Sequence, residues 1–224
     1  MPDRKHIKPT SKPKAIIFDV DKTLTDATTW YTLTKALGGN THAHAQTFFS
    51  FLNGKITYQE MKVELFKIWL NKGPVSKQKI QSIVQNVQYT GEALSTFRSL
   101  QERGYPLVLI SSSFDTFIEE VAKRFEIKHW YANCKFIFDK NDNWIDLEDH
   151  KDEAVLKVKQ LKEFLKKSKI KPEECMAIGD GENDIELFKI VPGIAFRPAT
   201  DHLTQVAWQE VKYLPRVIQI IESI

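Results

Sequence analysis

The sequence predicts an α/β protein, a doubly wound parallel sheet with a small α-helical domain inserted after its first strand. Three observations indicate this architecture. Short, continuous apolar segments recur along the chain, helical patterns alternate with them, and residues 29–90 interrupt the alternation with helical patterns alone. Alternating strands and helices are typical of a parallel sheet covered by helices on both faces.

Four segments have the continuous apolar character of a strand that is buried on both faces. They are residues 14–20, 106–110, 175–178 and 191–196. Helical patterns accompany the later strands at residues 95–102, 114–125, 152–167 and 183–190. Residues 132–147 are predicted to form a β-hairpin, because two apolar segments flank the turn-forming sequence Lys-Asn-Asp-Asn.

The insertion at residues 29–90 contains four predicted helices, at 29–37, 42–52, 57–70 and 76–88. Glycine and proline separate them, at Gly38-Gly39, Asn53-Gly54 and Gly73-Pro74. Its aromatic residues are expected to form its own core. The predicted organisation is therefore a basic arm at 1–13, a core at 14–28 and 91–224, and a helical insertion at 29–90.

Composition limits the classes of function. The chain has 224 residues, of which 42% are hydrophobic and 27% charged, and this excludes a fibre, a coiled coil and a wholly disordered chain. A net charge of +3 is too small to indicate a nucleic-acid partner. No apolar segment approaches the roughly 18 residues that span a bilayer. We therefore expect a cytoplasmic protein without a nucleic-acid or membrane partner.

The cysteines and the first 13 residues are two further features of the composition. Cys134 and Cys175 do not suggest a disulfide framework, since Cys175 lies in an apolar segment typical of a core. Residues 1–13 contain four Lys or Arg and three prolines and almost nothing apolar, so a disordered arm is expected.

Polar side chains follow three of the predicted strands, at the edge where α/β sheets bind ligands. Asp19-Val-Asp21-Lys-Thr23 follows the first, Ser111-Ser112-Ser113 the second, and Gly179-Asp180-Gly181-Glu-Asn183-Asp184 the third. Several carboxylates in one pocket are costly without a counter-charge, and a divalent cation is the simplest remedy. Ligands that are all oxygens favour Mg²⁺. A carboxylate beside Mg²⁺ and phosphate can act as a nucleophile.

These three motifs, in this order and each at a predicted strand end, resemble the signature of the haloacid dehalogenase superfamily. The match is closest to its phosphoserine-phosphatase-like hydrolases and covers about residues 14–221. The resemblance implies a Rossmann-like core with a helical cap at residues 29–90. It also implies a Mg²⁺-dependent phosphatase that hydrolyses a small phosphorylated metabolite through an aspartyl-phosphate.

The resemblance assigns roles around the phosphate. Asp19 would attack phosphorus, and Asp21 would protonate the leaving group and then activate water. Thr23 would orient Asp21, and Ser111 would bind a phosphoryl oxygen. Ser112, Gly181 and Asn183 are expected to line the phosphate site.

The same resemblance assigns the metal ligands. Asp180 would bind Mg²⁺ together with Asp19 and the main-chain carbonyl of Asp21. Asp184 would support the metal directly or through water.

An active-site lysine is also implied, and Lys157 is the predicted one. It lies 23 residues before Asp180, which fits the spacing in the family. Lys151 and Lys159 are alternatives because this segment is rich in lysine.

The leaving group of the substrate stays open. Phosphoserine phosphatases carry a glutamate nine positions after the nucleophile, where this chain has Thr28. They also carry an arginine in the cap, whereas this chain has no arginine between Arg4 and Arg98. Both departures argue against phosphoserine as the substrate, because arginine is the residue best suited to bind its carboxylate. Trp30 and Tyr31 either face the substrate or belong to the helix core.

Two other functions remain as alternatives. A phosphotransferase would pass the aspartyl-phosphate to an acceptor other than water. A non-catalytic binding protein that uses the basic arm is disfavoured by the complete set of carboxylates.

Overall fold

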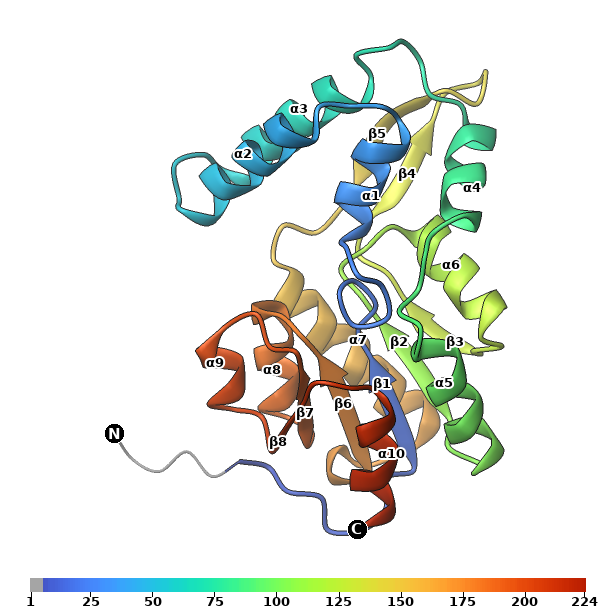
Figure 1. Cartoon of the computed structure of the whole chain (residues 1–224), viewed down its shortest axis with the longest axis vertical. Coiled ribbons are helices and arrows are strands. Elements are labelled where there is room, and N and C mark those ends of the chain that lie inside the picture. The colour runs from blue at the N-terminus through green and yellow to red at the C-terminus, as the bar shows by residue number, and fades with distance from the viewer. Residues whose placement is uncertain (1–5) are drawn as a thin grey trace.

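A six-stranded parallel sheet forms the centre of the structure, a computed structural model that describes residues 6–224 (Figure 1). The strand order is β3-β2-β1-β6-β7-β8. The strands are β1 (Ala15–Phe18), β2 (Leu107–Ile110), β3 (His129–Tyr131), β6 (Cys175–Gly179), β7 (Gly193–Phe196) and β8 (Gln209–Val211). Renumbered within this sheet, the order is the 3-2-1-4-5-6 of a doubly wound fold, so the predicted fold class is confirmed.

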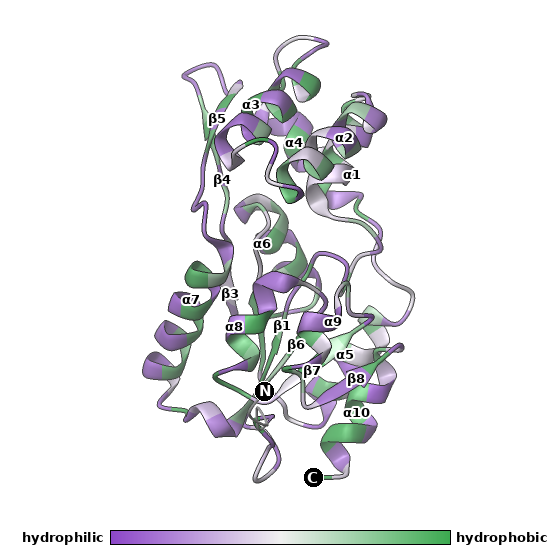
Figure 2. Ribbon diagram, turned by 90° about the vertical axis from the view of Figure 1, so that its left-hand side faces the viewer, coloured by the Kyte–Doolittle hydropathy of each residue, from purple (hydrophilic) through white to green (hydrophobic). Residues whose placement is uncertain are grey.

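Helices cover both faces of this sheet (Figure 2). Ile16 and Phe18 of β1 pack on one side, in a cluster that contains α5 (Ala93–Glu102), α6 (Asp115–Arg124) and α10 (Pro215–Glu222). Ala15 and Ile17 pack on the other side with α7 (Glu153–Ser168), α8 (Ile185–Phe188) and α9 (Asp201–Thr204). Alternate residues of a strand point to opposite faces, so each central strand is apolar throughout.

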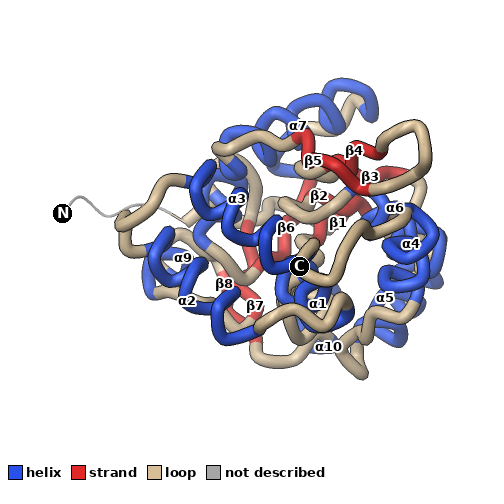
Figure 3. The backbone as a smooth tube through the Cα atoms, turned by 90° about the horizontal axis from the view of Figure 1, so that it is seen from above, coloured by secondary structure: helices blue, strands red, loops and turns tan. Residues whose placement is uncertain are grey.

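Four helices form the cap, as predicted, and each begins at a residue whose side chain caps it. The helices are α1 (Thr29–Ala36), α2 (Thr41–Leu52), α3 (Tyr58–Trp69) and α4 (Lys77–Gln85). Thr28, Asn40, Thr57 and Ser76 accept hydrogen bonds from main-chain N–H groups of the first turns. Seen from above, α4 lies beside α6 of the core (Figure 3).

The cap joins the core through two adjacent segments of chain. The Thr90 N–H donates to the Leu24 carbonyl at 2.8 Å, and Thr25 and Tyr89 form an isolated antiparallel bridge. Such pairing at both ends agrees with an insertion after the first strand. The exact division into domains at residues 28 and 91 stays a prediction.

The predicted hairpin is present as β4 (Lys135–Phe138) and β5 (Trp144–Glu148), but it packs on the cap. The Trp144 ring lies 4.7 Å from Phe66 and 5.2 Å from Trp69, measured between ring centroids. The Trp144 N–H also donates to the Val75 carbonyl at 2.8 Å. Two strands alone bury too little apolar surface to be stable, so the hairpin completes the aromatic core of the cap.

Several short elements were not predicted. They are the edge strands β3 and β8, of three residues each, and the helices α9 and α10 in the last part of the chain. The helix expected at 183–190 is a 3-10 turn, Glu182–Asp184, followed by α8, and a further 3-10 turn covers Pro172–Glu174. Three-residue edge strands carry too little apolar pattern to be found by periodicity.

Other expectations concern the arm, the cysteines and membrane spans. Residues 1–5 of the basic arm lie outside the described residues, and residues 6–13 form neither helix nor strand, although Lys12 pairs with Glu222 at 3.3 Å. Cys134 and Cys175 are both buried and free. Within residues 6–224, no helix combines the length and apolar character needed to cross a membrane.

Trp144 is predicted to be the main anchor of the hairpin. Its side chain is 2% exposed, so Trp144→Ala should leave a cavity and lower the free energy of unfolding by about 3–5 kcal/mol. The neighbouring Ile145 is 54% exposed, and Ile145→Ala should change it by less than about 0.5 kcal/mol. Urea unfolding followed by circular dichroism measures both, and equal losses would contradict the packing described.

Candidate active site

The candidate site lies where β1 and β6 end side by side. Asp19 follows β1 and Asp180 follows β6, and the Asp19 N–H donates to the Ile178 carbonyl at 2.9 Å. The strand order reverses between these two strands. Ligands of doubly wound sheets bind at this reversal, outside the carboxyl ends of the strands.

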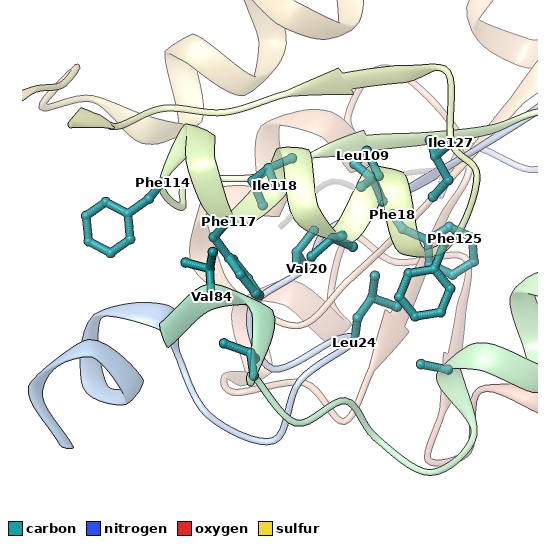
Figure 4. Packing of buried hydrophobic residues seen from close by; sticks show 14 of the residues in the cluster. Phe18, Val20, Leu24, Val84, Leu109, Phe114, Phe117, Ile118, Phe125 and Ile127 are labelled. Atoms are coloured by element: carbon teal, nitrogen blue, oxygen red, sulfur yellow. The ribbon is translucent and has the colours of Figure 1, made fainter. Parts of the chain in front are cut away.

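A tight turn presents Asp19 and Asp21 on either side of a buried valine. The Val20 carbonyl accepts the N–H groups of Thr23 and Leu24, at 3.2 and 2.8 Å. Lys22 takes a left-handed conformation, with φ 58°, that reverses the chain. Figure 4 shows Val20 and Leu24 among the side chains of α6, so apolar packing fixes the turn that carries both carboxylates.

The loop after β6 folds Asp184 back onto the end of that strand. The Gly181 N–H donates to Asp184 Oδ2 at 3.2 Å. A Cβ at Gly179 would lie only 2.2 Å from the same oxygen, so this approach requires a glycine. Oxygens of Asp19, Asp180 and Asp184 consequently lie within 4.8 Å of one another, all three residues being buried.

Lys157 of α7 reaches this group of carboxylates. Its Nζ donates to Asp19 Oδ1 at 2.9 Å, to Asp184 Oδ1 at 2.7 Å and to Asn183 Oδ1 at 3.2 Å. The residue is 1% exposed, whereas Lys151 and Lys159 are exposed. Of the three lysines considered, Lys157 is therefore the one that the fold brings to the carboxylates.

One lysine does not balance these buried charges. Burial raises the pKa of Asp180 to about 8, and the charges of Asp19 and Asp184 add to this. Burial also raises the pKa of Asp19 to about 6, although Lys157 opposes the shift. Burial alone would lower the pKa of Lys157, but the charges of Asp184 and Asp19 raise it overall.

Asp180 makes no ion pair with a basic side chain anywhere in the described part of the chain. Three oxygen donors with this deficit of positive charge fit a hard divalent cation such as Mg²⁺.

Asp21 is held by Thr29, the first residue of α1. Thr29 Oγ1 lies 2.7 Å from both carboxylate oxygens of Asp21, and the Thr29 N–H donates to Oδ1 at 3.0 Å. Burial raises the pKa of Asp21 to about 7. The Thr23 hydroxyl donates to Asp180 Oδ1 at 3.5 Å, and its predicted role in orienting Asp21 stays a prediction.

The serine segment after β2 lies against the same group. The Asn183 amide donates to Ser112 Oγ at 3.1 Å and to Glu153 Oε2 at 2.9 Å. Ser111 is buried, and its Oγ accepts the Ser113 N–H at 3.3 Å. The structure thus brings Ser112 and Asn183 to the site and places Ser111 next to Ser112 at the end of β2, and their predicted roles stay predictions.

Trp30 and Tyr31 occupy different environments. The Trp30 side chain is 5% exposed and stacks on Phe114, with ring centroids 5.1 Å apart, while Trp69 lies 5.5 Å away. This packing favours the core alternative for Trp30, because aromatic rings already cover its surface. Tyr31 is 37% exposed and lies edge-on to His44, so its substrate contact stays a prediction.

Three residues of the site were missed from the sequence. They are Thr29, Ser113 and Glu153, which form hydrogen bonds within the site. Thr29 and Glu153 lie outside the motifs, and Ser113 belongs to one but was given no role. One feature of the sequence could have indicated Thr29: it follows the helix-capping residue Thr28 and lies only eight positions after Asp21.

The comparison with known families agrees with this geometry. A family model for haloacid dehalogenase-like hydrolases matches residues 16–189, and the chain belongs to this family. The match contains most of β1, the cap and the loop after β6, and therefore Asp19, Asp21, Asp180 and Asp184.

Curated relatives and solved structures point to one subgroup. The chain is 26% identical over 182 residues to a phosphoserine phosphatase of Methanocaldococcus jannaschii, covering 80% of this chain and 82% of that protein. It is 28% identical to one of Archaeoglobus fulgidus, covering 87% of this chain and 55% of that protein.

The fold matches a phospho-aspartyl intermediate analogue of phosphoserine phosphatase, with a TM-score of 0.76 and 22% identity over 94% of this chain and 99% of that one. A hydrolase of the same family from Salmonella enterica serovar Typhi gives a TM-score of 0.81 and 18% identity, over 96% of this chain and 74% of that one.

Removing Lys157 should destabilise the metal-free protein in a pH-dependent way. Without its charge the pKa values of Asp19 and Asp180 rise further above the unfolded value near 4. A raised folded-state pKa favours folding at low pH, and this contribution is lost as the pH rises through the folded pKa. Lys157→Met should therefore cost about 3–5 kcal/mol near pH 8 and clearly less near pH 5.

The control for this variant is Lys159→Met, on the same helix but exposed, which should change the free energy of unfolding by less than about 0.5 kcal/mol. Urea unfolding in EDTA at the two pH values measures both variants. A cost for Lys157→Met that is the same at both pH values would contradict the electrostatic account.

Proposed function

We propose that this protein is a Mg²⁺-dependent phosphomonoester hydrolase that works through an aspartyl-phosphate on Asp19. The observation that carries the proposal is the position of Asp19, whose carboxylate lies beside Lys157 and two further buried aspartates. Membership of the haloacid dehalogenase-like hydrolases supports it.

The proposed reaction has two displacements at phosphorus. In the first, an Asp19 oxygen forms a bond to phosphorus while the bond to the leaving oxygen breaks, and Asp21 gives its proton to that oxygen. In the second, Asp21 takes a proton from water, whose oxygen attacks phosphorus and frees Asp19. A pKa of about 7 suits Asp21 to both transfers near neutral pH.

Asp19, Asp180 and Asp184, with the Asp21 carbonyl, would hold the Mg²⁺ ion. Bound there, the ion would neutralise charge on the phosphoryl oxygens. Lys157 holds Asp19 in place and supplies one positive charge, and Ser111, Ser112 and Asn183 would bind or position the phosphoryl group.

The proposed substrate is a small phosphorylated metabolite, chosen by the cap, and the proposed compartment is the cytoplasm. Groups around the phosphate treat all monoesters alike, so discrimination must come from residues that touch the leaving portion. Transfer to an acceptor other than water would use the same intermediate.

Phosphoserine hydrolysis is the second candidate, and the names of the curated relatives favour it. Two features of the cap disfavour it. Thr28 serves as the N-cap of α1, and Lys62, a buried cation of α3, is already paired with Asp149 at 3.0 Å and Asp146 at 3.3 Å. A lysine with two carboxylate partners has little capacity left for the carboxylate of a substrate.

Asp19→Asn should abolish turnover without unfolding the protein, because asparagine has nearly the same shape but is a poor nucleophile. We expect a loss on the order of a thousandfold or more in kcat for a generic phosphate ester. The control Asp26→Asn changes an exposed residue of the same segment and should retain activity. EDTA should stop the parent protein and Mg²⁺ should restore it, so full activity in EDTA would contradict the proposal.

Phosphoserine should be a poor substrate in a panel of phosphorylated metabolites, because the cap contains no arginine and its buried lysine, Lys62, is already paired with Asp149. Esters without a carboxylate should have the higher kcat/KM. A kcat/KM for phosphoserine that equals the best compound of the panel would establish the second candidate instead.

A further inference from the structure

We propose that Thr29 and Ser113 are positioning residues for the general acid Asp21, and that the cap thereby controls how well poor leaving groups depart. The inference rests on the proposed function, since it assigns a partner to the acid of that reaction. It concerns two hydroxyls outside the roles that the family resemblance assigns.

Thr29 determines how the Asp21 carboxyl group is oriented. Its N–H donates to Oδ1 alone, at 3.0 Å, whereas its hydroxyl oxygen lies 2.7 Å from both carboxylate oxygens. Oδ1 thus receives a main-chain donor that cannot turn away. A carboxyl proton is then most stable on Oδ2, which identifies Oδ2 as the oxygen that delivers it.

Ser113 determines how the Thr29 hydroxyl is oriented. The two hydroxyl oxygens are in direct hydrogen-bond contact, and both residues are buried, Thr29 at 4% and Ser113 at 0% exposure. A hydroxyl has one proton to donate, so when Thr29 donates to the carboxylate its oxygen accepts the proton of Ser113. The chain of donors therefore runs from Ser113 through Thr29 to Asp21.

Aromatic packing holds this hydroxyl pair in place. The residues that follow, Trp30 and Phe114, stack with ring centroids 5.1 Å apart. Thr29 and Trp30 belong to the first turn of α1 in the cap, whereas Ser113 and Phe114 precede α6 in the core. The two consecutive contacts fix the cap helix against the core at the point where it touches Asp21.

The leaving group distinguishes this role from a structural one. A leaving oxygen that is a weak acid must receive a proton as its bond to phosphorus breaks, whereas a strongly acidic phenol departs without one. Phenyl phosphate and p-nitrophenyl phosphate are close in shape and differ mainly in this need. The quantity to compare is kcat/KM, because it reports the steps up to the first bond cleavage at phosphorus.

The experiment measures both esters with Thr29→Val, Thr29→Ser and Ser113→Ala. Thr29→Val should lower kcat/KM for phenyl phosphate by about 10–100-fold and for p-nitrophenyl phosphate by about threefold or less. Thr29→Ser keeps the hydroxyl and should return both values to within about threefold of the parent. Ser113→Ala should change the ratio of the two esters in the same direction as Thr29→Val.

Thr34→Val is the matched control on the same helix. Thr34 is equally buried, and its hydroxyl accepts from Trp69 Nε1 at 2.7 Å and contacts His44 Nδ1 at 2.7 Å. The variant removes a buried hydrogen-bonding hydroxyl of the cap without touching Asp21. It should lower the thermal midpoint and leave the ratio of the two esters unchanged.

Failure of this inference and failure of the proposed function give different results. Equal losses on both esters with Thr29→Val, or no rescue by Thr29→Ser, in a parent that is active and depends on Asp19, would overturn the positioning role alone. An Asp19→Asn variant that still hydrolyses both esters would overturn the proposed function itself.

Discussion

The site depends on one buried ammonium group. Lys157 donates to Asp19 and Asp184, which lie far apart in the chain, and it sits on a third segment, α7. Without that charge, carboxylates at the ends of β1 and β6 could not be buried within 4.8 Å of one another. The ion pairs thus fix the relative positions of two strand ends and one helix, and everything that would bind phosphate is built around them.

The second constraint is the contact between the cap and the core. The hydroxyl of Thr29 and the ring of Trp30 meet Ser113 and Phe114, so the polar contact that orients Asp21 sits beside an aromatic stack. The hairpin adds Trp144 to the same cluster through Phe136, which stacks on Phe114. Packing far from the carboxylates therefore determines the environment of the proposed general acid.

Much of the fold could be predicted because its central strands and longer helices have a strong local pattern. The strands β1, β2, β6 and β7 are continuous apolar segments, and every cap helix has a capping residue and a glycine or proline break. The edge strands β3 and β8 were not predicted because three residues are too few to show a periodic apolar pattern. The packing of the hairpin against the cap could not be predicted for a different reason, since an apolar face does not indicate which surface it covers.

The sequence by itself determined the carboxylates of the site, because parallel strands end at one edge and Asp19, Asp21, Asp180 and Asp184 follow two such ends directly. Only the tertiary structure decided which lysine reaches them. Lys157 is buried and Lys159 is exposed, although both lie on α7. Residues of one helix differ in burial because only one of its faces packs against the rest of the protein. The partner of Asp21 was decided in the same way, because Thr29 reaches it through the docking of a helix that local sequence cannot place.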